Sequence, residues 1–257
     1  MRILYIGDSH IRSMIDGAVA TPAPAGIEEV FFGAAVPQLA DNVFSVENQH
    51  LIPSSPKVRE MFKYTGGSET IDLKSFDACV LVSWCSSVMF VFQLIGRRVF
   101  HLPKRLFSLE QKNSQLLSDT VYREYLQQGI ENFWKLHPLI KEHINGEILV
   151  LQRPIKAEAQ SVSPAAQQTE VTRLKRELYS DLCEEYETVI RNAGARFVQQ
   201  PAETLTEQLE TKREFCLGSV HLFGNDPHEE EEVFHMNKDY GSTCLREIRS
   251  IVGAGGR

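Results

Sequence analysis

The sequence predicts a single α/β domain over residues 1–257, a three-layer α/β/α sandwich around a parallel sheet of about five strands. Two observations lead to this fold class. Short apolar runs typical of buried strands recur along the chain, and helical patterns lie between several of them. No internal repeat and no shift in composition marks a domain boundary, and a chain of this length supports one core.

Five segments are expected to form the sheet, because each is a short, mostly apolar run of the kind that is buried in parallel sheets. They are residues 2–6, 29–32, 78–83, 147–152 and 195–199. The helical patterns that alternate with them indicate that the strands run parallel.

Helical spacing of apolar residues is clear in three segments. Residues 122–144 form the first, in which Pro138 should bend or break the helix. Residues 172–192 form the second, which stops before Gly194, and residues 244–251 form the third.

Two segments interrupt this alternation. Residues 42–68 alternate apolar and polar side chains and then reach a Thr-Gly-Gly-Ser run, which indicates an insertion, either a hairpin or a long loop. Residues 157–169 are rich in Ala, Gln and Ser and are expected to form a surface loop. Loops at the carboxyl ends of strands form the rim of a ligand site, so both segments are expected to shape substrate choice.

The first strand runs into Gly7-Asp8-Ser9-His10 and then into a helical pattern. A serine at this turn stands at the carboxyl end of a strand, where open α/β sheets bind ligands. It also lies near a helix N-terminus, which favours developing negative charge. Asp8 or Ser9 could instead be an ordinary helix cap. Residues 3–10 alone therefore leave open whether Ser9 is a reactive serine or part of a cap.

A second motif lies near the end of the chain, 235–241, with the sequence His-Met-Asn-Lys-Asp-Tyr-Gly. An N-terminal Gly-Asp-Ser joined to a C-terminal His-x-Asn-x-x-Tyr-Gly resembles the SGNH, or GDSL-type, hydrolase superfamily. The resemblance implies that Ser9 is the nucleophile, that His235 is its base, and that Glu232 orients the histidine where the family usually has Asp. Among the neighbouring acids, Asp226 and residues 230–231 stay open as alternatives to Glu232.

The resemblance also implies three hydrogen-bond donors for the oxyanion that forms in acyl transfer. They are the N–H of Ser9, the N–H of Gly33 after the second strand and the side chain of Ser86 after the third. Gly33 could equally serve an ordinary turn. Ser86 stands where the family has an asparagine, and a hydroxyl is a shorter donor than an amide. Either Ser86 substitutes, another group supplies the donor, or the site is weak.

His10 and Arg12 follow the nucleophile in the first helical turn, where one of them could bind an anionic or hydroxyl-rich substrate. The alternative is that both lie on the solvated face of the helix. The SGNH family has a Gly-x-Asn-Asp motif after the third strand, where this chain has Trp84-Cys85-Ser86-Ser87. Residues 224–227 read Gly-Asn-Asp-Pro and are similar to that motif, but they do not follow the third strand. Because all four are turn formers, a turn is expected there.

The net charge of -7 gives no sign of a basic surface of the kind that binds nucleic acid, so a nucleic-acid partner is not expected. No apolar run reaches membrane-spanning length and no signal-peptide pattern opens the chain, which predicts a cytoplasmic protein without a membrane partner.

The five cysteines form no C-x-x-C pair and are expected to be mostly buried and reduced. No cofactor is expected. No metal site is expected either, because His221, His228 and His235 recur at seven-residue steps on loop-like sequence.

These inferences lead to a serine-dependent ester hydrolase or acyltransferase that acts on a small-molecule or carbohydrate acyl ester through an acyl-serine intermediate. The alternative is a catalytically weak or inactive module that keeps the fold and binds a glycan or a protein partner. The departures at Ser86 and Glu232 favour this alternative. Neither the substrate nor the oligomeric state follows from these residues.

Overall fold

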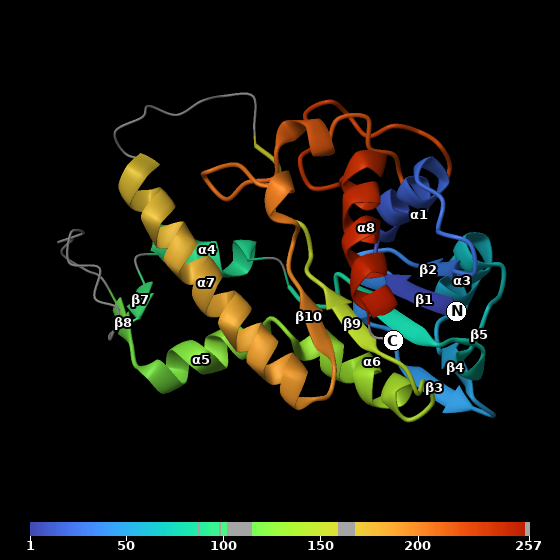
Figure 1. The fold of residues 1–257 in the computed structure, drawn as a ribbon. Helices are drawn as coiled ribbons and strands as arrows, with labels where there is room; N and C mark the ends of the chain where they lie inside the picture. Colours follow the sequence, from blue (N-terminus) through green and yellow to red (C-terminus); the bar gives the residue numbers. More distant parts are fainter. Residues whose placement is uncertain (87, 98, 102–114, 159–167, 255–257) are drawn as a thin grey trace.

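A computed structural model of the chain describes residues 1–86, 88–97, 99–101, 115–158 and 168–254. At its centre lies a five-stranded parallel sheet with the strand order β10-β9-β6-β1-β2 (Figure 1). The strands are β1 (Arg2–Gly7), β2 (Glu28–Gly33), β6 (Ala78–Val82), β9 (Ile148–Leu151) and β10 (Arg196–Val198). Each coincides with one of the five predicted segments within one or two residues at its ends, and the predicted fold class is confirmed.

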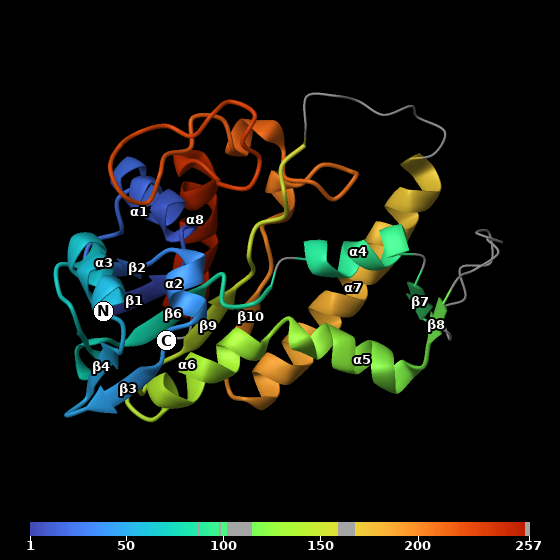
Figure 2. The same ribbon diagram turned by 180° about the vertical axis from the view of Figure 1, so that it is seen from behind.

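Two helices that are far apart in the sequence cover one face of the sheet. α1 (Ile11–Ala20) and α8 (Lys238–Ala254) lie side by side there in both views (Figures 1 and 2). The buried side chains of this layer include Ile3 and Tyr5 of β1. Leu4 and Ile6, which alternate with them, belong to the core on the opposite face. β1 therefore contributes to both cores, because successive side chains of a strand point to opposite faces of the sheet.

The opposite face is covered by helices from the middle of the chain. They are α3 (Pro56–Gly66), α6 (Glu131–Lys141) and α7 (Gln168–Asn192), while α4 (Met89–Arg97) and α5 (Asp119–Gln128) pack against α7 and extend the same core beyond the sheet (Figures 1 and 2). The remaining short elements are α2 (Val36–Ala40), β5 (Ile71–Asp72), β7 (Val99–His101) and β8 (Gln115–Leu117). Helices on both faces complete the three layers.

The segment 42–68 contains a hairpin, one of the two forms expected there. β3 (Phe44–Glu47) pairs antiparallel with β4 (His50–Pro53). The second half of the segment is α3, a helix that was not expected. Its start is fixed by Ser55, whose hydroxyl accepts the N–H of Val58 at 3.5 Å, and by Pro56 at the first helical position.

Of the two effects expected at Pro138, a bend or a break, the break does not occur. The helical pattern of residues 122–144 is divided at Gly129, between α5 and α6, and Pro138 lies inside α6. The Gly129 carbonyl accepts the N–H of Ser86 at 2.6 Å, a hydrogen bond to a residue outside the two helices. Pro138 lacks only one intrahelical N–H, and α6 continues past it for three residues.

The stop predicted before Gly194 is confirmed, since α7 ends at Asn192. Of the expected surface loop 157–169, residues 159–167 lie outside the described residues. All five cysteines are buried and unpaired. None of the helices in the described ranges has the length and apolar character that crossing a bilayer would require.

Candidate active site

Ser9 lies at the carboxyl edge of the sheet, beside the point where the strand order reverses. β1 pairs with β2 on one side and with β6 on the other. The chain thus adds β2 on one side of β1 and then crosses to add β6, β9 and β10 on the other side. Open α/β sheets bind ligands at such a switch point. The N–H of Ile11 bonds the Asp8 carbonyl at 3.0 Å, and the N–H of Arg12 bonds the Ser9 carbonyl at 3.2 Å. These bonds place Ser9 at the entrance to α1.

His235 reaches the same place from the other end of the chain. Its Nε2 lies 3.1 Å from the Ser9 hydroxyl, across 226 sequence positions. The loop that carries it is held by Asn237, whose side-chain amide donates to the Glu214 and Leu217 carbonyls at 2.7 and 2.9 Å. The side-chain Oδ1 of Asn237 also accepts the N–H groups of Asp239 and Tyr240 in the first turn of α8, so this residue caps the helix.

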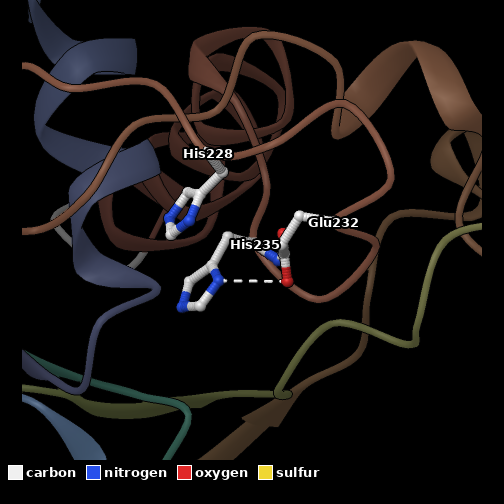
Figure 3. A group of neighbouring side chains, drawn as sticks. All are labelled: His228, Glu232 and His235. Atoms are coloured by element: carbon white, nitrogen blue, oxygen red, sulfur yellow. Dashed lines mark hydrogen bonds and ion pairs between the residues drawn. The ribbon is translucent and has the colours of Figure 1, made fainter.

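The acid beside the imidazole is Glu232. Its Oε1 lies 3.3 Å from His235 Nδ1, an ion-pair distance that does not meet hydrogen-bond geometry (Figure 3). Each carboxylate oxygen accepts one backbone N–H at 2.8 Å, from Phe234 and from His235. Burial by itself raises the pKa of the Glu232 carboxyl, but these donors and the imidazole together hold that pKa below its usual value. The group is therefore ionised at neutral pH.

The competing acids lie elsewhere. Residues 229–231 are exposed, and so is Asp226, whose carbonyl accepts the N–H of His221 at 3.1 Å. The structure thus brings Glu232, and not Asp226, to the imidazole.

A cavity of about 830 Å³ opens beside Ser9. His10 forms part of its wall and is only 7% exposed, with its ring 5.5 Å from that of His235. Burial lowers the pKa of His10 to about 4, so its imidazole is neutral. The wall also contains Ser9, Ala35, Val36, Pro37, Met89, Arg153, Pro154, Lys156, His221, Leu222, Phe223, His228, Glu232, Phe234 and His235.

Two of the three expected oxyanion donors do not line the cavity, and one of them is occupied by another group. The N–H of Gly33 donates to the Thr65 hydroxyl at 2.9 Å, and Gly33 is not part of the cavity wall. Ser86 also lies outside the wall, and its N–H bonds the Gly129 carbonyl. The prediction for Gly33 fails because Thr65 of α3 occupies its N–H, and the packing of Ser86 against the α5–α6 junction leaves Ser86 outside the cavity wall.

Arg12 does not line the cavity either. Its guanidinium pairs with Asp16 at 2.9 Å, and it donates to the Gly224 carbonyl at 2.9 Å and to Asn225 Oδ1 at 3.1 Å. The segment 224–227 is the expected turn, closed by a bridge between Val220 and Pro227. Arg12 thus attaches this turn to α1 and binds no ligand in the cavity.

Arg153 is a cavity residue that sequence reasoning missed. It follows β9 and pairs with Asp8 at 2.6 Å, with 26% and 7% of the two side chains exposed. Asp8 also accepts the N–H of His10 at 3.0 Å. The available signal was the Arg-Pro pair at the carboxyl end of the fourth predicted strand, the edge at which the cavity lies.

The loop before α8 also gathers possible metal ligands, against the expectation of no metal site. His228, Glu232 and His235 each offer one ligand atom, and these atoms lie within 4.8 Å of one another (Figure 3). The His228 and His235 rings stack at 4.2 Å with an interplanar angle of 9°. Sequence spacing alone did not predict this cluster, because the seven residues from His228 to His235 form an irregular loop, in which spacing does not show which side chains meet.

No protein-family model and no curated protein matches the chain. Among solved structures, the extracellular lipase from Streptomyces rimosus is similar with a TM-score of 0.51 at 10% identity, over 98% of this chain and 99% of the lipase. A carbohydrate acetylesterase family member from Sinorhizobium meliloti gives 0.42 at 10% identity, over 98% and 100% of the two chains. An acetyl-xylooligosaccharide esterase from Geobacillus gives 0.43 at 11%, over 98% and 94%. The chain therefore shares the overall fold of the Streptomyces rimosus lipase, a parallel sheet between two layers of helices.

Proposed function

We propose that this protein hydrolyses or transfers acyl esters through an acyl-serine intermediate formed on Ser9. The observation that carries the proposal is the 3.1 Å contact between the Ser9 hydroxyl and His235 Nε2. A serine hydroxyl becomes an effective nucleophile when a base removes its proton, and a histidine within hydrogen-bond reach is suited to that task.

In this mechanism His235 carries its proton on Nδ1, so that Nε2 can accept one. The ionised Glu232 carboxylate beside Nδ1 favours that tautomer. The Ser9 oxygen attacks the ester carbonyl while its proton passes to Nε2. The tetrahedral intermediate then expels the alcohol, which takes this proton and leaves the acyl-serine. Water repeats the sequence and frees the acid, whereas a second alcohol in place of water gives transfer.

The negative charge on the carbonyl oxygen requires preorganised donors. The Ser9 N–H is one candidate, since no hydrogen bond occupies it in the described part of the chain. Ala35 and Val36 form the cavity wall where Gly33 does not, and their N–H groups are likewise without hydrogen bonds there. Arg153 adds a positive charge on the same wall.

The cavity wall supports the choice of substrate class. Pro37, Leu222 and Phe223 offer apolar surface for a short acyl group, while Lys156 and His10 offer polar groups for a hydroxyl-rich alcohol. A small or carbohydrate acyl ester fits this mixture.

A specific observation favours a second candidate. The occupied Gly33 N–H and the position of Ser86 leave fewer oxyanion donors than the family pattern supplies. A catalytically weak module that binds a glycan or a protein partner through the same cavity is the alternative.

Hydrolysis of p-nitrophenyl acetate and of acetylated sugars by the wild type, Ser9→Ala and Ser86→Ala separates the two. The esterase proposal requires measurable turnover that Ser9→Ala removes almost completely, because no other group replaces the attacking oxygen. Ser86→Ala is the matched serine control and should retain wild-type turnover. Equal activity of wild type and Ser9→Ala on every ester would favour the binding module.

A further inference from the structure

We infer that His228, Glu232 and His235 form a binding site for one divalent transition-metal ion of the Zn²⁺ type, and that the bound ion switches off the serine. Two imidazole nitrogens and a carboxylate oxygen are a donor set that Zn²⁺ prefers. All three residues lie on the loop that leads into α8, so one loop supplies the whole site. The inhibition, though not the binding, rests on the function proposed above.

The distances suit a tetrahedral ion. Bonds of about 2.0–2.1 Å place tetrahedral donor atoms roughly 3.3–3.4 Å apart. His235 Nδ1 and Glu232 Oε1 are already 3.3 Å apart. The ligand atoms of all three residues lie within 4.8 Å of one another, but the His228 ring is stacked on that of His235 at an angle of 9°. Because an imidazole nitrogen binds a metal in the plane of its ring, the His228 ring has to turn out of this stack as well as approach.

An independent observation is that two nitrogens of this group make no hydrogen bond, although the Glu232 carboxylate lies 3.3 Å from one of them, His235 Nδ1. His228 Nε2 and His235 Nδ1 are buried without a hydrogen bond. Buried polar atoms are nearly always satisfied, and each exception requires an explanation. An ion between the two rings and the Glu232 carboxylate would satisfy both nitrogens and neutralise the negative charge beside them.

The His228 ring is prepared for such a bond. The ring lies against that of His235, with 4.2 Å between the ring centroids, and its Nε2 is buried without a hydrogen bond. Nε2 is therefore the nitrogen of His228 that is available as a ligand atom.

The metal and the serine chemistry compete for one imidazole. Neutral His235 has a single ring proton, so a bond from Nδ1 to the ion places that proton on Nε2. Nε2 can then no longer accept the proton of Ser9. The carboxylate of Glu232 is engaged by the same ion, which removes the group that favours the productive tautomer. The ion therefore blocks both groups that would activate Ser9.

Calorimetric titration of the chelator-treated, desalted protein with Zn²⁺ tests the site itself. The expected result is one ion per chain, with affinity reduced about 100-fold or more in His228→Ala, beyond the roughly 10–100-fold that loss of an outer partner costs. His228→Asn, which keeps a polar side chain, should show the same loss if His228→Ala folds poorly by circular dichroism. His50→Ala, an exposed histidine on β4, is the matched control and should bind as the wild type does. No binding, or binding that is insensitive to both His228 variants, would overturn the site.

Labelling of Ser9 by a fluorophosphonate, with and without Zn²⁺, tests the switch. One equivalent of Zn²⁺ should slow labelling of the wild type at least tenfold, and chelator should restore it. Unchanged or faster labelling at saturating Zn²⁺ would overturn the switch. Absence of labelling even without Zn²⁺ would overturn the proposed function and the switch together, while the calorimetric result would still decide the metal site.

Discussion

Gly241 of α8 lies directly against the backbone of Ser13 in α1. A Cβ atom at Gly241 would stand 1.8 Å from the Ser13 carbonyl oxygen, a distance that no packing permits. α1 begins two residues after Ser9, and α8 begins three residues after His235. The contact between these two helices therefore sets the separation of the serine and the histidine. It explains why the C-terminal motif ends in glycine.

The first prediction follows from this contact. Gly241→Ala should lower the free energy of unfolding by at least about 2 kcal/mol, because the added methyl group meets rigid backbone. Gly253→Ala lies in the same helix, where nothing is within 4 Å of the added atom. This control should raise the free energy by roughly 0.5–1 kcal/mol through helix propensity. Urea denaturation of both variants checks the prediction, and similar effects of the two would disprove it.

The second prediction concerns the acid of the proposed triad. Glu232→Gln should lower kcat on the order of 10³–10⁴-fold, since an amide cannot favour the productive tautomer of His235 as a carboxylate does. Glu231→Gln is the matched control on the same loop, and its exposed side chain predicts wild-type turnover. A loss in Glu231→Gln that equals the loss in Glu232→Gln would show that the acid is assigned wrongly.

The third prediction concerns the ion pair of Arg153 and Asp8. Arg153→Met should lower the free energy of unfolding by about 2–4 kcal/mol, because it leaves the buried Asp8 carboxylate unpaired. The double variant with Asp8→Asn should recover most of this loss, since no buried charge then remains. Purely additive effects in a double-mutant cycle would show that the two side chains are not energetically coupled.

The fourth prediction is a dependence of stability on pH that arises at His10. Burial lowers the pKa of His10 to about 4, whereas an unfolded histidine has a pKa near 6.5. Between these values only the unfolded chain binds the proton. The contribution of His10 to stability is therefore fully present above pH ~6.5 and is lost as the pH falls towards ~4.

His10→Gln should remove this contribution. The difference in unfolding free energy between wild type and His10→Gln should change by about 3 kcal/mol from pH 7 to pH 4. His50→Gln, at an exposed site, should follow the wild-type curve. Parallel curves for wild type and His10→Gln would mean that His10 is not buried as a neutral group.

The sheet and the ends of the chain were predictable because their signals are local. Each of the five strands is a short apolar run, and the two motifs flank α1 and α8 directly. The missed helix α3 also had a local signal, Ser55 followed by Pro56 at its start. It was overlooked because the preceding alternation of apolar residues suggested a strand or a loop.

The positions of the expected oxyanion donors and the cluster of His228, Glu232 and His235 were not predictable in this way. Gly33 loses its free N–H to Thr65, and Ser86 is turned towards Gly129, both through contacts between distant segments. His228 reaches His235 through an irregular loop whose course has no sequence period. Such contacts depend on tertiary packing, which a pattern within one segment does not contain.

The most direct test of the proposed chemistry is mass spectrometry of the protein after reaction with a fluorophosphonate. A serine that is activated by His235 and Glu232 predicts one adduct per chain, on the peptide that contains Ser9, and none in Ser9→Ala. An adduct on a different residue, or equal labelling of wild type and Ser9→Ala, would contradict the assignment of Ser9 as the nucleophile.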